Sequence, residues 1–331
     1  MSKLYIFGIG GTGSRVLKSL TMLLASGVKI KADEIVPVII DPDLAAANLT
    51  QTVALMRNYV NIRNSLNFNT ASKNKFFGTK LNLDIVPNVV MTLQDTQDKK
   101  FREYIGLDSM RTDGRENANY ALASMLFSQK NLDSNMEVGF KGNPNIGSVV
   151  LNQYQDSPVF QNIAASFNQG DRIFVISSIF GGTGASGFPL LIKNLRAVST
   201  HLSGSGYVKN APIGAITVLP YFDLAPDTNP DEEQRSEIDS STFISKTKAA
   251  LTYYDRNVTE TNVLYYIADT VSKQYNNVEG GTEQKNEAHF VELAAALSII
   301  DFMAMPDDSV STQNGQPDNT IYKEYGIIAV P

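Results

Sequence analysis

LYIFGIGGTG, residues 4–13, joins a short apolar segment to a glycine-rich turn, and a helix-like stretch follows. IFVISSIFGGTGASG, residues 173–187, has the same order about 170 positions further along the chain. Where a strand turns directly into a helix, unpaired backbone N–H groups and the positive end of the helix dipole meet at one point, which favours a bound phosphate. Two such turns predict a nucleotide whose phosphate chain is held from two sides.

The composition is that of a folded protein with a sizeable core. The chain has 331 residues, of which 43% are hydrophobic and 19% are charged, so wholesale disorder is not expected. This length allows one large α/β domain or two smaller ones. The net charge of −6 gives no strong signal for binding to nucleic acid or to anionic membranes.

Residue types that are rare or missing exclude several kinds of site. The chain has no cysteine, which excludes a cysteine nucleophile, a disulfide and a cysteine-bound metal. Its two histidines, His201 and His289, are too few for a histidine-rich metal centre. Glycines between residues 8 and 13 interrupt the apolar N-terminal run, and no stretch of about 18 apolar residues occurs, so neither a signal peptide nor a membrane span is expected. These features predict a cytoplasmic protein.

Alternating apolar segments predict an α/β fold, with a doubly wound, mostly parallel sheet and helices on both faces. The expected strands lie at residues 4–9, 35–40, 85–90, 173–176, 213–219 and 263–267. The expected helices lie at residues 15–25, 44–64, 118–127, 188–195, 239–255 and 286–304. The last helix carries one apolar face, made of Phe290, Leu293, Leu297, Ile300 and Met303. Residues 65–110 and 128–158 are predicted to be insertions or loops.

Several side chains are expected at the carboxyl edge of this sheet, where parallel α/β proteins bind ligands. Asp41 and Asp43 follow the second strand, and such carboxylates can hold Mg²⁺ through water. An aspartate–proline turn that caps a helix explains the same two residues equally well. Tyr221 and Asp269 follow later strands, and Tyr221 either stacks on a base or packs in the core.

Three further residues each have a functional and a structural interpretation. Arg115 either neutralises a terminal phosphate or forms a surface ion pair. Asn286 either reads a guanine edge through its amide or caps the last helix. Glu292 either belongs to a set that activates water or is an ordinary carboxylate on a helix face.

The second turn resembles the signature loop of the tubulin/FtsZ superfamily, Gly-Gly-Gly-Thr-Gly-Ser/Thr-Gly. The central Gly-Gly-Thr-Gly is present at residues 181–184, with Phe180 at the first glycine position and Ser186 at the last. Other features of the superfamily occur in the same order, and they are a first glycine loop at 8–13, an acidic turn at 41–43, Gly-Arg at 114–115, a Pro-Phe-like turn at 220–222, Asp269, and a long helix from 286.

This resemblance implies a GTP/GDP-binding domain over residues 1–304, with Mg²⁺-dependent GTP hydrolysis and nucleotide-dependent self-assembly into a homo-oligomer or filament. It leaves residues 305–331 as a short C-terminal segment in place of a second domain. The catalytic groups stay unidentified, with Arg115 and Glu292 as candidates. The residues that the resemblance assigns to the nucleotide are Gly10, Gly11, Thr12, Gly13, Asp41, Gly114, Arg115, Gly181, Gly182, Thr183, Gly184, Ala185, Tyr221, Asp269 and Asn286, with Asp41 and Asp43 for Mg²⁺.

Two alternatives stay open. The first turn is also similar to that of ThiF and the ubiquitin-activating enzymes, which adenylate a carboxylate with ATP. This similarity extends to Asp41-Pro42-Asp43 and to Asn48-Leu49, but it does not predict a second glycine loop at residue 181. The other alternative is a non-catalytic assembly protein, in which a bound nucleotide only orders an interface.

Overall fold

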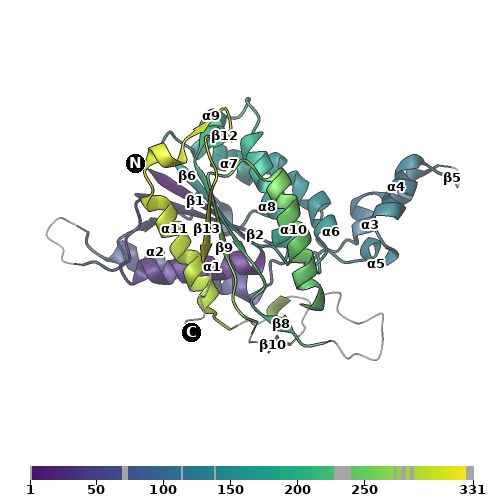
Figure 1. Ribbon diagram of the computed structural model, residues 1–331, viewed down its shortest axis with the longest axis horizontal. Coiled ribbons are helices and arrows are strands. Elements are labelled where there is room, and N and C mark those ends of the chain that lie inside the picture. The colour runs from purple at the N-terminus through teal and green to yellow at the C-terminus, as the bar shows by residue number, and fades with distance from the viewer. Residues whose placement is uncertain are drawn as a thin grey trace.

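In the part of the chain that the structure describes, seven parallel strands form one central sheet in the order β13-β9-β7-β6-β1-β2-β3 (Figure 1). The structure is a computed structural model, and it describes residues 2–68, 74–112, 115–137, 139–226, 240–271, 274–276, 281–283 and 287–325. The strands of the sheet are β1 (Lys3–Ile9), β2 (Glu34–Ile40), β3 (Lys80–Leu81), β6 (Arg172–Ser178), β7 (Ile213–Val218), β9 (Val263–Ile267) and β13 (Ile321–Tyr325). The predicted α/β fold with a parallel sheet is confirmed.

Helices cover both faces of this sheet. They are α1 (Gly10–Ala25), α2 (Ala47–Ser65), α3 (Phe101–Tyr104), α4 (Ala118–Leu126), α5 (Gln129–Leu132), α6 (Pro144–Val150), α7 (Pro158–Ser166), α8 (Gly182–Arg196), α9 (Ser205–Asn210), α10 (Phe243–Asn257) and α11 (Phe290–Ala304). On one face α1 packs against α2 and α11, and on the other α8 packs against α6 and α10 (Figure 1). None of the described helices is long and apolar enough to cross a membrane.

Shorter elements complete the description. The small strand pairs are β4 (Arg111–Thr112) with β5 (Arg115–Glu116), β8 (Asp223–Leu224) with β10 (Gln274–Tyr275), and β11 (Thr312–Gln313) with β12 (Gln316–Pro317). The 3-10 turns are η1 (Pro87–Val89), η2 (Leu107–Met110), η3 (Leu151–Asp156), η5 (Ser240–Thr242), η6 (Gly281–Glu283) and η7 (Asp307–Val310). The segment with α3, α4, α5, β4 and β5 extends away from the sheet (Figure 1).

The centre of the sheet is a topological switch point between β1 and β6. From β1 the chain crosses through α1 to β2, and from β6 it crosses through α8 to β7 on the opposite side. Both central strands are continuous apolar runs, and β6 is buried along its whole length, as expected for parallel strands that helices cover on both faces. Since ligands bind at the carboxyl ends of strands at a switch point, the turns after β1 and β6 are the natural place for a site.

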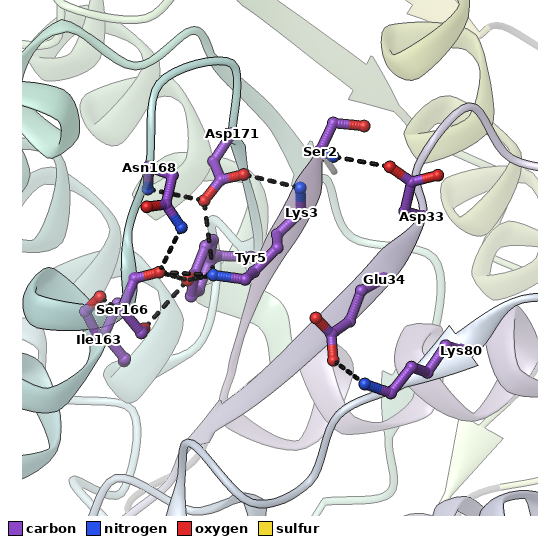
Figure 2. A network of polar contacts seen from close by, with 10 residues as sticks. All are labelled: Ser2, Lys3, Tyr5, Asp33, Glu34, Lys80, Ile163, Ser166, Asn168 and Asp171. Carbon is purple, nitrogen blue, oxygen red and sulfur yellow. Dashed lines mark hydrogen bonds and ion pairs between the residues drawn. The ribbon is translucent and has the colours of Figure 1, made fainter.

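The amino edge of the same sheet is tied together by polar contacts within the chain (Figure 2). The Asp171 carboxylate accepts hydrogen bonds from the backbone N–H groups of Lys3, at 2.7 Å, and Asn168, at 2.9 Å. The Ser166 carbonyl accepts from the Lys3 ammonium, at 2.5 Å, and from the Tyr5 hydroxyl, at 3.0 Å. These contacts join the starts of β1 and β6, so this edge has a structural role.

The expected strand at residues 85–90 is wrong. The third strand on this side is β3, a two-residue strand, and residues 87–89 form a 3-10 turn. Asn88 and Val89 have φ angles of 55° and 66°, which do not fit an extended strand, and Pro87 has no N–H to donate to a ladder. Val90 alone reaches the sheet, through an isolated bridge with Ile39.

The loop-like character expected for residues 128–158 is also incorrect. This range contains α5, α6 and η3, and α7 begins at its last residue. Pro144 and Pro158 each stand in the first turn of a helix, where the missing N–H of proline costs nothing. The two prolines therefore mark helix starts. Whether 65–110 and 128–158 are insertions stays a prediction.

The last helix begins four residues later than expected, and its buried face differs from the expected one. Phe290, Leu293 and Leu297 are 61%, 37% and 45% exposed. The buried face instead carries small and branched residues, including Ala295 and Ile299. Because α11 is apolar on nearly all sides, periodicity alone does not select the face that packs, and alanines allow α1 to approach closely.

Candidate functional site

The two glycine-rich turns lie side by side. β1 and β6 are neighbours, with Gly8 opposite Ile176. A Cβ atom built on Gly10 would lie 3.6 Å from the Thr183 Cβ, so the two turns are in contact distance. α1 starts at Gly10 and α8 starts at Gly182, so the N-termini of two long helices meet at this point. The predicted convergence of the two turns is confirmed.

Two glycines of these turns serve the close approach of helix to strand. A Cβ atom on Gly13 would lie 2.3 Å from the Gly8 carbonyl carbon, and one on Gly184 would lie 2.5 Å from the Ser178 carbonyl oxygen. No side chain fits at such distances, so both positions require glycine. The packing brings the first turn of each helix directly above the end of its strand.

A pocket opens above these turns, and it has a polar and an apolar part. The polar part consists of Gly10, Gly11, Thr12, Arg15, Asp41, Asp43, Ser178, Gly181, Gly182, Thr183 and Gly184, together with the segment Gly139–Gly142. The apolar part consists of Ala46, Phe180, Phe222, Leu224 and Phe243, with Asn276 beside them. Phe180 contacts Phe222 and Phe243, at ring-centroid distances of 5.5 and 5.0 Å, so these rings form one continuous wall.

The segment at residues 139–142 is a third wall that the sequence reasoning missed. Gly139, Lys141 and Gly142 have φ angles of 92°, 44° and 74°. A Cβ atom on Gly139 would lie 3.9 Å from both the Thr183 hydroxyl oxygen and the Pro42 ring. The segment therefore touches the second glycine turn and the aspartate turn at once. Two glycines around a lysine, just before the proline that starts α6, are the signal that could have revealed it.

Asp41 and Asp43 line the pocket and also hold their own turn together. The Asp43 N–H donates to Asp41 Oδ1 at 3.1 Å, and Asp43 Oδ2 accepts from the Gly281 N–H at 2.6 Å. The pKa of Asp41 is raised to about 7, mainly by burial and also by the nearby charge of Asp43, although the hydrogen bond from the Asp43 N–H lowers it. Both interpretations of the pair, a structural turn and an acidic site, therefore have support.

Asp41 and Asp43 have the chemistry of ligands for Mg²⁺. Two carboxylates that line one pocket are hard oxygen ligands, and a divalent cation beside them would stabilise the charged form of Asp41. Among the described residues, no cluster of three or more acidic or histidine side chains could hold a metal by itself. The residues thus fit a cation that is held partly by water and by a ligand, and they do not fit an all-protein cage.

A buried ion pair connects the first turn to α11. Arg15 Nε donates to Glu292 Oε1 at 2.5 Å, and Arg15 Nη2 donates to the Tyr221 hydroxyl at 2.7 Å and to Thr12 Oγ1 at 3.3 Å. The Tyr221 hydroxyl in turn donates to Glu292 at 3.2 Å. Only Thr12 and Arg15 of this network line the pocket. Tyr221 and Glu292 are thus placed behind the site, where they position Arg15.

The remaining predicted site residues lie apart from the pocket lining or outside the description. Asp269 faces His289, with 3.6 Å between Oδ2 and Nε2, and the Ala185 carbonyl accepts from the Tyr254 hydroxyl at 3.1 Å. His289 caps α11 by accepting from the Val291 N–H at 3.2 Å. Gly114, Asn286 and the side chain of Arg115 lie outside the described residues. Their roles stay predictions.

Comparison with known proteins gives similarity at the level of structure. No protein-family model and no curated protein matches the sequence. The chain is similar to a GTPγS-bound protofilament of CetZ2 from Haloferax volcanii, with 14% identity over 93% of this chain and 61% of that one and a TM-score of 0.42. The chain is also similar to the GDP-bound monomer of CetZ1 from the same organism, with 13% identity over 93% of this chain and 62% of that one and a TM-score of 0.41.

An empty FtsZ dimer from M. jannaschii is a further similar structure, with 14% identity over 81% of this chain and 45% of that one and a TM-score of 0.34. The chain spans about 61% of the length of the first of these proteins. At these identities the likeness concerns the fold alone.

Proposed function

We propose that the chain binds a guanine nucleotide in the pocket at the carboxyl edge of its sheet. The single observation that supports this most is the meeting of the α1 and α8 N-termini, because each presents unpaired N–H groups and a positive dipole end to the same small volume. Thr12 and Thr183 add hydroxyl donors there. The phosphates of the nucleotide occupy this polar part.

The apolar part of the pocket suits the planar end of the same ligand. Phe222, Leu224 and Phe243 offer surfaces on which a base can pack, and the Asn276 amide can donate and accept hydrogen bonds at once. A pocket with amides on one side and aromatic rings on the other matches a molecule with an anionic tail and an aromatic head. The match is to a nucleotide rather than to inorganic phosphate.

The proposed activity is Mg²⁺-dependent hydrolysis of GTP. Asp41 and Asp43 would hold the cation through water, and Mg²⁺ when bound neutralises the charge of the terminal phosphates. The chain itself contributes position and charge: the helix N-termini fix the phosphates, and Glu292 and Tyr221 hold Arg15 at the wall of the pocket. Arg115 stays a candidate for a catalytic group, whereas Glu292, which lies behind the pocket and holds Arg15, is a positioning residue.

Self-association is the third part of the proposal. Leu122, Met125 and Leu126 of α4 are 55%, 85% and 59% exposed, and Phe290 and its neighbours give α11 a second exposed apolar stripe. Exposed apolar patches of this kind are typical of interaction sites. Sedimentation velocity with GTP and with GDP tests this part, and larger species are expected with GTP. A Met125→Glu variant should reduce them, whereas an unchanged monomer with both nucleotides would contradict self-association.

The contact between the two glycine turns favours this function over adenylation of a carboxylate. The similarity to adenylating enzymes covers the first turn and the aspartates. It does not predict the second helix N-terminus, near Thr183, that lies beside the first. ATP–pyrophosphate exchange with a candidate acceptor would support adenylation. Measuring phosphate release distinguishes hydrolysis from a non-catalytic role. A release rate per molecule that rises with protein concentration would indicate active sites completed between subunits.

The decisive experiment identifies the nucleotide. Protein purified in Mg²⁺ is denatured, and the small molecules that it releases are separated by chromatography. In a second experiment, nucleotide-free protein is titrated with GTP, GDP and ATP by calorimetry. We expect guanine nucleotide in the released fraction and tighter binding of GTP than of ATP. Protein that binds neither GTP nor GDP would overturn the proposed function.

A further inference from the structure

We propose that two copies of this chain pair through the outer edge of β13, antiparallel and related by a twofold axis, and so join their two sheets into one. This interface is separate from the nucleotide pocket and does not depend on the proposed function. β13 is the last strand on its side of the central sheet, next to β9. Among the described residues no strand pairs with its other side, so this edge is able to accept a further strand.

The two outer strands of the sheet differ in how they are protected against such pairing. β3 has two residues, and the side chain of Lys80 in it is 56% exposed. A short strand and an exposed lysine are both typical protections of a sheet edge. β13 has five residues, and its Lys323 ammonium lies 2.6 Å from Asp301 Oδ2 of α11. That ion pair neutralises the lysine, so β13 lacks the protection that β3 has.

The backbone of β13 directs two of its residues outward. The Ile321 N–H donates to the Asn262 carbonyl at 2.8 Å, so Ile321 directs its backbone groups toward β9. Backbone groups alternate between the two sides of a strand, and Tyr322 and Glu324 therefore direct theirs to the open side. If Tyr322 lies opposite Glu324 of the second copy, the N–H and C=O groups of both residues form four hydrogen bonds across the twofold axis.

The side chains of these two residues complement each other in that arrangement. Tyr322 and Glu324 lie on the same face of the sheet, because they are two positions apart. Tyr322 is 59% exposed and Glu324 is exposed as well, so no described element covers this face of the strand. A tyrosine hydroxyl then lies opposite a carboxylate, to which it can donate, once on each side of the axis.

Lys323 lies on the axis in this register, opposite its own copy. Like charges directly opposite each other destabilise a strand pair, but each Lys323 has the Asp301 carboxylate of its own chain beside it. A register shifted toward the C-terminus would instead place Glu324 opposite Glu324, with no such neutralising partner given by the strand. The register centred on Lys323 is therefore the favoured one.

A second copy is the partner that this edge fits best. The complementary groups, Tyr322 and Glu324, stand on the same strand, so an antiparallel copy of that strand supplies both contacts at once. A twofold contact uses the same edge of both chains and leaves only the two β3 edges free. Because β3 is short and carries an exposed lysine, the assembly is expected to stop at a dimer.

The first test uses the absence of cysteine from the chain, since a single introduced cysteine then reports on its own position only. In Lys323→Cys the two Cα atoms lie about 4.5 Å apart across the axis, within the range of about 4.4–6.8 Å that a disulfide needs. We expect a covalent dimer on a non-reducing gel after oxidation with diamide. Glu324→Cys is the matched control, because its two copies lie about 7–8 Å apart and should not be linked.

The second test reverses the charges of the interface. Sedimentation velocity over a range of protein concentrations, without nucleotide, gives the dissociation constant of the dimer. Tyr322→Glu places carboxylates opposite each other and should weaken the dimer by about 10- to 100-fold. Adding Glu324→Lys to that variant should restore the constant to within about 3-fold of the wild type, because each pair then has opposite charges. Such a rescue does not follow from a structural role within one chain.

Three results would overturn the proposal. They are a wild type that stays monomeric at all concentrations, equal cross-linking or none in the two cysteine variants, and a double variant that does not recover. The nucleotide experiments decide the proposed function separately. A chain that forms this dimer but binds neither GTP nor GDP would overturn the proposed function and leave the β13 interface in place.

Discussion

The two edges of one sheet differ in how their polar groups are satisfied. At the amino edge, the Asp171 carboxylate is bound by two backbone N–H groups, and the side chains of Lys3 and Tyr5 share one carbonyl (Figure 2). At the carboxyl edge, the charge of a second carboxylate, Asp43, adds to the effect of burial in raising the pKa of Asp41, and two helix N-termini lie at a pocket. The amino edge is thus satisfied within the chain, whereas the carboxyl edge places two carboxylates and two helix N-termini around a pocket, and the proposed nucleotide site rests on that arrangement.

The largest expected effect comes from breaking the buried ion pair behind the pocket. Glu292→Ala would leave the Arg15 guanidinium buried without its carboxylate and would remove the acceptor of the Tyr221 hydroxyl. We expect the free energy of unfolding to fall by about 3–5 kcal/mol. Urea denaturation monitored by circular dichroism measures this. A loss below about 1 kcal/mol would show that the network is not a main connection between α1 and α11.

Asp41 gives the carboxyl edge a pH dependence of its own. Its pKa is about 7 in the folded, ligand-free chain and close to 3.8 in the unfolded chain, so the folded state binds the proton more tightly. The stability that this group contributes is therefore present below pH 4 and is lost as the pH rises through 7. Each pKa unit corresponds to about 1.4 kcal/mol.

The measurement is urea denaturation between pH 4 and pH 8, for the wild type and for Asp41→Asn. Asparagine does not titrate, so the variant should show a smaller decline of stability over this range. The difference between the two curves isolates Asp41 from the other acids of the chain. Parallel curves would mean that Asp41 has an ordinary pKa in the folded chain and does not make the free energy of unfolding depend on pH.

Alanine substitutions of one glycine at each edge compare how tightly the backbone is packed there. At the carboxyl edge, Gly13→Ala would bring a methyl group to 2.3 Å from a backbone atom of Gly8 and should destabilise the fold by about 1–3 kcal/mol. Gly206→Ala is the control, since Gly206 lies in α9, before the start of β7, with nothing within 4 Å of its Cβ position. That variant should be neutral or slightly more stable. Equal thermal stability of both variants would contradict the close packing of α1 on β1.

The sequence predicted the centre of this fold better than its periphery. The runs that became β2, β7 and β9 are apolar and bounded by turns, so their type and position were readable. Residues 85–90 look like a strand, but the left-handed angles of Asn88 and Val89 depend on tertiary contacts that no local pattern encodes. The buried face of α11 was unreadable for a similar reason, because its apolar residues surround the helix.

The candidate site shows the same division. Gly10 and Thr183 were predicted to converge, because both turns follow strands that feed helices. The segment around Lys141 was missed, because it follows no strand and reaches the pocket only through the packing of α6 on α8. Tyr221 was assigned to the ligand from its place after a strand, but that place gives no information on the partner, Arg15, that holds its hydroxyl.

The smallest expected effect lies at the amino edge and completes the comparison. Lys80 and Glu34 form an ion pair at 2.8 Å, but the Lys80 side chain is 56% exposed. Lys80→Ala should therefore lower the free energy of unfolding by less than about 1 kcal/mol, and the effect should shrink further in high salt. Urea denaturation at low and high salt measures both. A loss as large as that of Glu292→Ala would contradict the view that ion pairs matter most where water is excluded, since both pairs have similar separations and differ mainly in burial.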